Sequence, residues 1–136
     1  MLKIFPRISR FVVSRQLSQV KITELEFDKK SEEYLNKISE YLDTLPDIVS
    51  CDNEYDVNYS MGVITAKISD NVGTYVINKQ TPNCQIWLSS PISGPKRYDY
   101  IQGDWIYNHD KMSLNQLLTI EFQKIFKTDK INFCSK

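Results

Sequence analysis

The stretch GTYVINKQTPNCQIWLSSPISGPKRYDY, from Gly73 to Tyr100, decides the fold. It contains three short segments, GTYVIN, CQIWLSS and KRYDY, in which apolar and polar residues alternate. Turn residues separate them, around Pro82 and between Pro91 and Pro95. Alternation with a period of two, interrupted by such turns, is typical of short strands. The stretch therefore predicts three consecutive strands of an antiparallel meander.

The same period of two extends to both sides of this stretch. YDVNYS and GVITAKI read as a hairpin, with a turn at Ser60-Met61-Gly62 in which Gly62 can adopt a positive φ. DWIYNH reads as one more strand after the turn at Gln102-Gly103. We therefore predict a sheet of about six strands.

Helical spacing appears on either side of the meander. Between residues 27 and 45 six apolar residues recur at helical spacing, with acids on the opposite side, and Pro46 is a stop signal with Asp47 just beyond it. SLNQLLTIEFQKIFK begins with a capping box, Ser113 and Gln116, and has one apolar face interrupted by Glu121.

The order helix, meander, helix predicts an α+β fold, a two-layer α-β sandwich. Both terminal helices are expected to pack on one face of the antiparallel sheet, and the other face is expected to meet solvent or a partner.

Charge is segregated along the 136 residues, although the formal net charge is zero. Residues 1–21 contain five bases and no acid, the composition of an amphipathic mitochondrial transit peptide, with a disordered basic arm as the alternative. A single domain is then expected over residues 22–136. That domain would keep all 17 acids and 12 of the 17 bases, which disfavours a nucleic-acid partner. No stretch is long and apolar enough for a membrane helix.

The three cysteines, Cys51, Cys84 and Cys134, are widely spaced and form no C-x-x-C pair. They indicate neither a disulfide framework nor a zinc site, and are expected to be reduced thiols that pack as small apolar residues.

Trp87 is expected to point away from the helices. Alternation places Ile86 and Leu88 on the core face and Trp87 with polar neighbours on the other, near Arg97 of the next strand. An exposed Trp beside polar residues and an Arg is typical of a protein interface hot spot. The alternative is that Trp87 packs beneath a neighbouring loop.

GTYVINKQTPN, QIWLSSPISGPKRYD and W-x-Y-x-H-D followed by SL-x-x-LL closely resemble the frataxin family, from about residue 24 to residue 127. The resemblance implies a mitochondrial matrix protein that binds iron and serves iron–sulfur cluster assembly. Such a protein activates a cysteine desulfurase–scaffold complex and could deliver Fe(II). The alternative is a ferroxidase or iron-storing oligomer that detoxifies ferrous iron. A monomer is expected, or an oligomer that forms with iron. The resemblance also implies a fold in which the C-terminal tail can fill a groove between the helices, with Ile131 and Phe133 as the candidates.

The resemblance also implies a docking set on the helix-free sheet face. Trp87 would be its aromatic anchor and Arg97 a charge-assisted donor. Cys84 stands where the family usually has a lysine, which removes a cation from the rim. The set comprises Asn78, Gln80, Asn83, Gln85, Trp87 and Arg97.

A second implied site is an acidic ridge that binds iron weakly through hard carboxylate oxygens. Asn36 and Thr44 interrupt it where many relatives have acids, and Lys29 projects toward the same side. Taken without the resemblance, such a charge run is more often a solvated face. The ridge comprises Asp28, Glu32, Glu33, Glu40, Asp43, Asp47, Glu54 and Asp56.

Catalytic residues are not expected. His109 and Asp110 resemble a general-base pair, but no Ser or Cys nucleophile has motif context, and a role in the turn before the last helix is expected instead. The Glu and Glu-x-x-His ligands of a buried di-iron centre are missing from the sequence.

Overall fold

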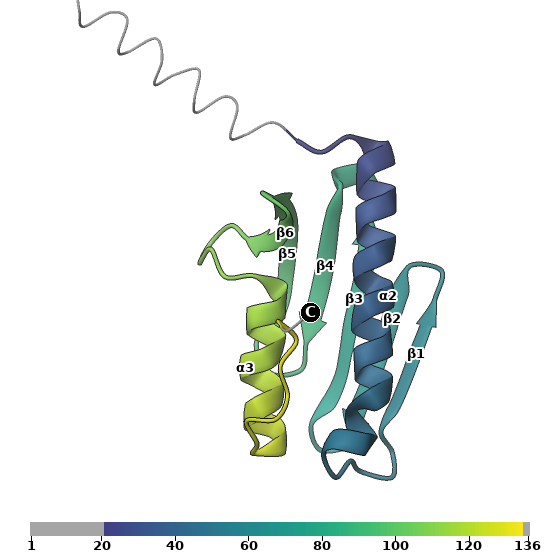
Figure 1. The fold of residues 1–136 in the computed structure, drawn as a ribbon, viewed down its shortest axis with the longest axis vertical. Helices are drawn as coiled ribbons and strands as arrows, with labels where there is room; N and C mark the ends of the chain where they lie inside the picture. The colour runs from purple at the N-terminus through teal and green to yellow at the C-terminus, as the bar shows by residue number, and fades with distance from the viewer. Residues whose placement is uncertain (1–20, 135–136) are drawn as a thin grey trace, which may run out of the picture.

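The computed structural model describes residues 21–134, which form two helices packed on a six-stranded antiparallel sheet (Figure 1). The predicted transit peptide lies almost entirely outside the described residues. The sheet is a plain meander in which each strand pairs with the next along the chain. The elements, labelled as in Figure 1, are α2 (Glu24–Ile48), β1 (Asp56–Ser60), β2 (Val63–Ser69), β3 (Gly73–Gln80), a 3-10 turn η1 (Thr81–Asn83), β4 (Gln85–Ser90), β5 (Gly94–Ile101), β6 (Asp104–Tyr107) and α3 (Leu114–Phe126).

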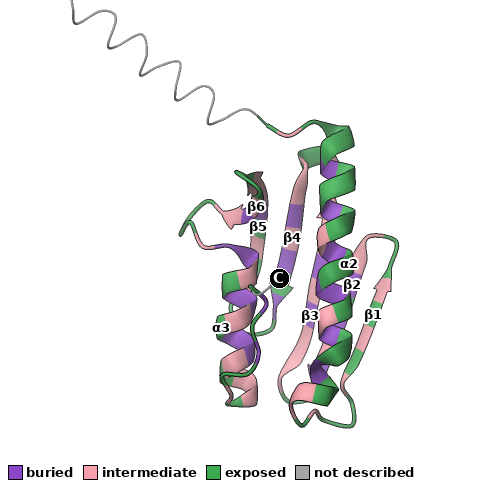
Figure 2. Ribbon diagram, in the orientation of Figure 1, coloured by how far each residue is buried: buried purple, intermediate pink, exposed green. Residues whose placement is uncertain are grey.

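Both helices cover the same face of the sheet, as predicted (Figure 1). The buried residues on the strands alternate with exposed or half-buried ones (Figure 2). They form one core cluster with the buried residues of α2 and α3. Ile86 and Leu88 are among this set, at 0% and 2% exposure, which confirms the predicted core pair of β4. Within residues 21–134 the opposite face of the sheet therefore has no helix over it.

The helix α2 is longer at both ends than predicted. It begins at Glu24 because Thr23 caps it with a reciprocal capping box to Glu26, a T-x-x-E signal visible in the sequence. The prediction that Pro46 stops the helix and that Asp47 lies beyond it is wrong. Both residues are helical, and the helix ends at Ile48.

The structure provides a physical reason for the tolerance of Pro46. A proline has no N–H, so the carbonyl four residues earlier, that of Leu42, loses its helical donor. The Tyr55 hydroxyl donates a hydrogen bond of 2.6 Å to this Leu42 carbonyl. A side chain from the segment after the helix therefore replaces the missing donor.

The predicted capping box of α3 is confirmed, with Ser113 and Gln116 each bonded to the other's backbone N–H. Glu121, which interrupts the apolar face of α3, is 6% exposed. Its carboxylate accepts hydrogen bonds from the hydroxyls of Tyr75 (2.7 Å), Ser90 (2.7 Å) and Ser93 (2.5 Å). The buried acid is thus satisfied, and it joins α3 to β3 and to the turn after β4.

The tail after α3 packs between the two helices, as predicted for Ile131 and Phe133, which are 0% and 7% exposed. The Phe133 ring lies 4.8 Å from the ring of Tyr41 on α2 and 5.1 Å from that of Phe122 on α3, centroid to centroid. The backbone N–H of Phe133 also donates to Thr119 Oγ1 at 2.9 Å. The tail is therefore part of the core and links the helices.

The strands differ from the predicted segments by one or two residues at their ends, and the differences at Cys84 and His109 bear on the site. Cys84 lies outside β4, in the left-handed conformation (φ 53°) that ends the 3-10 turn. His109 and Asp110 lie in the turn after β6, where Asp110 Oδ1 accepts a hydrogen bond from the backbone N–H of Met112 at 2.9 Å. This contact fits the predicted role of the pair in the turn before the last helix.

Candidate functional site

The helix-free face of the sheet, which we call the open face, brings Trp87 and Arg97 together. They are direct partners in the β4–β5 register, and the Arg97 guanidinium carbon lies 4.5 Å from the centroid of the indole ring. A cation this close to an aromatic face is attracted by the ring's quadrupole. Trp87 is half-buried, so part of the ring is available to a partner.

Trp87 lies in a shallow hollow of about 700 Å³ on this face. Asn78, Gln85 and Arg97 of the predicted docking set line the hollow with it. Its lining combines amide, charged and aromatic side chains, a composition suited to a compact protein contact. Its lining also includes residues that the sequence reasoning did not select for docking, among them Val76, Ser89, Pro95, Asp99, Asn108 and His109.

The other two predicted docking residues do not line the hollow. Asn83 is exposed in the 3-10 turn beside it. Gln80 is half-buried, and its Oε1 is the one buried side-chain oxygen without a hydrogen-bond partner among residues 21–134. The amide oxygen of Gln80 therefore points into the protein rather than toward a partner. The register places Gln80 opposite Gln85, at the end of β3.

Asp99 and His109 were missed for different reasons. Asp99 is the residue two positions after Arg97 on β5, so the alternation that placed Arg97 on the open face also places Asp99 there. His109 follows β6 in a turn, and its ring lies 5.0 Å from that of Tyr107. A period of two says nothing about residues in turns, so only the tertiary structure brings His109 to the hollow.

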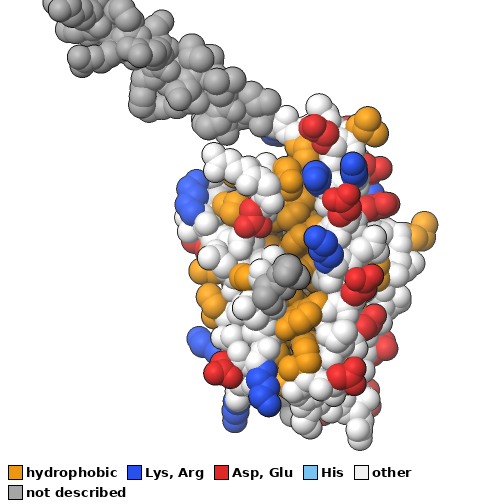
Figure 3. All heavy atoms as spheres, in the orientation of Figure 1, with side chains coloured by type: hydrophobic (Ala, Val, Ile, Leu, Met, Phe, Trp, Pro, Cys, Tyr) orange, Lys and Arg blue, Asp and Glu red, His pale blue; other side chains and the backbone are white. Residues whose placement is uncertain are grey.

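The eight residues of the acidic ridge are all exposed, and acidic side chains line the outer side of α2 in Figure 3. The structure divides the ridge into residues that form an ion pair with a lysine and residues that do not. At one end Lys79 Nζ lies 2.7 Å from Asp28 Oδ1 and 3.7 Å from Glu32 Oε2. The hydrogen bond from Lys79 to Asp28 is the main cause that raises the pKa of the Lys79 ammonium. Asp28 and Glu32 thus already hold a cation, that of Lys79.

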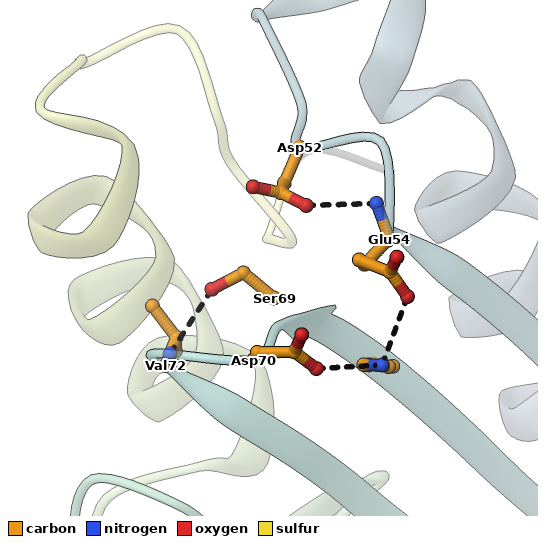
Figure 4. A network of polar contacts seen from close by, with 6 residues as sticks. Asp52, Glu54, Ser69, Asp70 and Val72 are labelled. Carbon is orange, nitrogen blue, oxygen red and sulfur yellow. Dashed lines mark hydrogen bonds and ion pairs between the residues drawn. The ribbon is translucent and has the colours of Figure 1, made fainter.

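Two further ridge residues have lysine partners. Glu33 Oε1 lies 3.9 Å from Lys30 Nζ, one turn away on α2. Glu54 Oε1 lies 3.1 Å from Lys67 Nζ, which also lies 2.9 Å from Asp70 Oδ1 in the network of Figure 4. The sequence patterns gave no indication that Lys67 and Lys79 pair with ridge acids, because these pairs join segments that are distant along the chain.

The remaining ridge residues, Glu40, Asp43, Asp47 and Asp56, form no ion pair within 4 Å in the described part of the chain. Glu40, Asp43 and Asp47 follow one another at spacings of three and four on α2, so they are neighbours on the helix surface. Their oxygens are the ligand type that suits hydrated iron. Within residues 21–134 no three His, Cys, Asp or Glu side chains are close enough to form a ready metal centre. This donor set therefore fits weak binding of an ion that keeps water ligands.

The three cysteines are free thiols, as predicted, but Cys134 is exposed and does not pack as the small apolar residue that was expected. Burial raises the pKa of the Cys51 thiol, which keeps it protonated. Cys84 is half-buried and packs against the core. Its thiol therefore does not supply the positive charge that a lysine at this position would bring to the rim of the docking set.

None of the described helices is both long and apolar enough to span a bilayer.

The comparisons with known proteins agree with this architecture. A family model described as "Frataxin-like domain" matches residues 20–128. Mitochondrial frataxin of Caenorhabditis elegans is 46% identical over 122 residues, which covers 89% of this chain and 90% of that protein. The mitochondrial frataxin homolog of Saccharomyces cerevisiae is 40% identical over 120 residues, covering 85% of this chain and 68% of the homolog.

Solved structures lead to the same family. A crystal structure of trimeric frataxin from the yeast Saccharomyces cerevisiae, complexed with ferrous iron, superposes with a TM-score of 0.65 at 40% identity. The superposition covers 73% of this chain and 87% of the yeast chain.

Proposed function

Because this chain belongs to the frataxin family, we propose that it is a mitochondrial iron-binding protein that activates a cysteine desulfurase–scaffold complex in iron–sulfur cluster assembly. The proposal extends to the matrix as its compartment and to the removal of residues 1–21 as a transit peptide. Its relatives in Caenorhabditis elegans and Saccharomyces cerevisiae are named as mitochondrial proteins, and the acid-free composition of residues 1–21 supports an import signal.

The observation that carries the proposal is Trp87 on the open face, half-buried beneath the Arg97 guanidinium and bordered by amide side chains. Trp and Arg are the residue types that most often dominate the binding energy of protein interfaces. Both lie on adjacent central strands, so the sheet holds them rigidly. The proposed role of this face is to dock on the desulfurase–scaffold complex and speed the transfer of sulfur to the scaffold.

We propose further that the acidic ridge binds iron weakly, with Glu40, Asp43 and Asp47 as its main ligands. These three carboxylates are exposed and adjacent, and they lack the lysine partners that engage Asp28 and Glu32. An open site of this kind could release its ion readily, which suits delivery of Fe(II) to the assembly complex.

A ferroxidase or iron-storing oligomer is the second candidate. It is favoured by the yeast structure, which is described as trimeric and complexed with ferrous iron. It ranks second because residues 21–134 contain no cluster of three metal-ligating side chains at which oxidation could be centred. In that case several copies of the chain would have to combine their ridges.

Substitution of the anchor tests the docking proposal. Trp87→Ala and Arg97→Ala are each expected to weaken binding to the matched desulfurase–scaffold complex by about 30-fold or more, the effect typical of a hot-spot residue. Sulfide production in the presence of each variant is expected to fall toward the rate without any added activator. Binding is measured by pulldown and titration.

A matched control is Met61→Ala, which removes an apolar side chain that is 98% exposed at the tip of the β1–β2 hairpin. This variant should bind and activate normally. Unchanged binding and activation by both Trp87→Ala and Arg97→Ala would exclude the open face as the docking site.

A further inference from the structure

Asp99, Gln85 and Trp87 form one chain of hydrogen bonds across the open face. Gln85 Nε2 donates to Asp99 Oδ1 at 3.0 Å, and Trp87 Nε1 donates to Gln85 Oε1 at 2.9 Å. The β4–β5 register explains the proximity, because Gln85 lies opposite Asp99 and Trp87 opposite Arg97. The indole is thus held at its N–H edge by Gln85, while Arg97 lies over its ring.

The direction of this chain is fixed by Asp99. An ionised carboxylate only accepts hydrogen bonds, so Gln85 must turn its NH₂ group toward Asp99. The amide oxygen of Gln85 then points toward the indole, whose N–H only donates. If Gln85 turned the other way, two donors would face each other at Trp87. Asp99 therefore selects the one amide orientation that can hold the Trp87 ring.

This restraint matters for binding because a side chain that is already ordered loses less conformational entropy when a partner binds than a side chain that binding must order. Immobilising one side chain at an interface weakens binding by a factor of about 2 to 13. The side chains of Gln85 and Trp87 both line the hollow. Because these side chains are ordered before binding, the affinity is higher than the contacts with the partner alone would give.

We propose that Asp99 is a positioning residue for docking, which acts through Gln85 to hold the Trp87 ring in its binding orientation. The proposal rests on the proposed function of the open face. It also changes the role of Gln85 from a direct contact with the partner to a link between Asp99 and Trp87, because both ends of its amide already form hydrogen bonds to these two residues. The indole N–H is engaged as well, so the partner is expected to contact the ring of Trp87 rather than its N–H.

The two tryptophans allow a direct test in the free protein by NMR. Trp87 lies on the open face, and Trp105 is 2% exposed in the core and serves as the internal reference. In Asp99→Asn the acceptor loses its charge and the new amide can also turn its NH₂ group toward Gln85, so Gln85 is held less firmly in the orientation that accepts from Trp87. The Trp87 indole N–H signal is expected to shift and to exchange faster with solvent, while that of Trp105 stays unchanged.

Two matched variants accompany it. Asp99→Glu keeps a carboxylate acceptor and is expected to retain slow exchange of the Trp87 indole N–H. Asp129→Asn removes one carboxylate from an exposed site in the C-terminal tail and should leave both indole signals unchanged. An unchanged Trp87 signal in Asp99→Asn would overturn the positioning role.

A double-mutant cycle with the desulfurase–scaffold complex tests the consequence for docking. Asp99→Asn alone is expected to weaken binding about tenfold, and to have no further effect in a Trp87→Ala background, because Asp99 acts through that ring. If the two losses add fully, Asp99 contacts the partner itself and the positioning role is wrong. Native binding by Trp87→Ala would instead overturn the docking function of the face, and the positioning role in docking with it.

Discussion

At the scale of single residues, Tyr55 shows how a side chain can permit a proline inside a helix. Pro46 removes the donor that the Leu42 carbonyl needs, and the Tyr55 hydroxyl supplies another at 2.6 Å. Burial is the main cause that raises the pKa of this phenol, so it remains a donor well into the alkaline range. The final turn of α2 thus depends on a residue outside the helix.

Removal of this hydroxyl is expected to be costly only while Pro46 is present. Tyr55→Phe leaves the Leu42 carbonyl without a donor and is expected to lower the free energy of unfolding by about 1–2 kcal/mol. In a Pro46→Ala background the backbone N–H restored at position 46 can bond to Leu42, so the same substitution should cost clearly less. Urea denaturation of the four proteins measures both values. An equal cost in the two backgrounds would contradict the proposed coupling.

At the scale of elements, the contact between β3 and α2 determines which carboxylates are free. Lys79 faces the helix layer from β3, because the open-face positions beside it are those of Asn78 and Gln80. Its ammonium bridges Asp28 and Glu32, and its side chain is only 18% exposed. A partly desolvated ion pair of this kind is screened less than a fully exposed one. A lysine of β3 therefore neutralises carboxylates in the first turns of α2, at one end of the acidic ridge.

Substitution of Lys79 is expected to extend metal binding along α2. In the unmodified protein, paramagnetic broadening by Mn²⁺ or anaerobic Fe²⁺ is expected at Asp43 and Asp47 but not at Asp28 or Glu32. In Lys79→Met the broadening should also reach Asp28 and Glu32, which then lack a competing cation. The measurement is an NMR titration of backbone amides.

The control is Lys67→Met. This variant removes a lysine that pairs with the ridge residue Glu54, far along the chain from Asp28, and with Asp70 outside the ridge. It should leave Asp28 and Glu32 unaffected by the metal. Broadening at Asp28 and Glu32 with Lys79 intact would show that the ion pair does not exclude the ion.

At the scale of the whole molecule, packing of two helices and a tail on one sheet face buries several phenols. Burial is the main cause that raises the pKa of Tyr34, Tyr75 and Tyr98, and for Tyr75 the hydrogen bond to Glu121 raises it further. These side chains come from the helix layer and from two different strands. Their ionisation is therefore coupled to the integrity of the whole core rather than to one element.

Stability is expected to fall at alkaline pH as a result. Phenols of the unfolded chain ionise near pH 10, whereas the buried phenols of the folded chain keep their protons to higher pH. Above about pH 10 the folded state binds more protons, so its stability falls as the pH rises. Below that pH the contribution is fully present. Urea midpoints measured from about pH 8 to about pH 11 should decline only in the upper part of this range.

Tyr98→Phe provides the matched control, because it removes one buried phenol and keeps the ring. The decline above about pH 10 is expected to be shallower in this variant than in the unmodified protein. A decline of equal steepness would show that Tyr98 does not contribute to the alkaline loss of stability.

Local patterns were sufficient for most of the fold. Alternation along β4 placed Ile86 and Leu88 in the core, and Ser113 with Gln116 correctly marked the start of α3. These predictions succeed because period and capping depend on residues a few positions apart. The prediction at Pro46 failed for the converse reason, since the group that compensates for this proline, Tyr55, acts from outside the helix.

The sequence by itself determined the layer order, the strand faces and the segregation of acids onto α2, because each follows from periodicity along the chain. Only the tertiary structure decided which of those acids are paired with Lys79 and how Asp99 and Gln85 hold Trp87. It also brought His109 to the hollow beside Trp87. The reason is that ion pairs and hydrogen-bond directions depend on which strands become neighbours and in which register, and no local pattern carries that information.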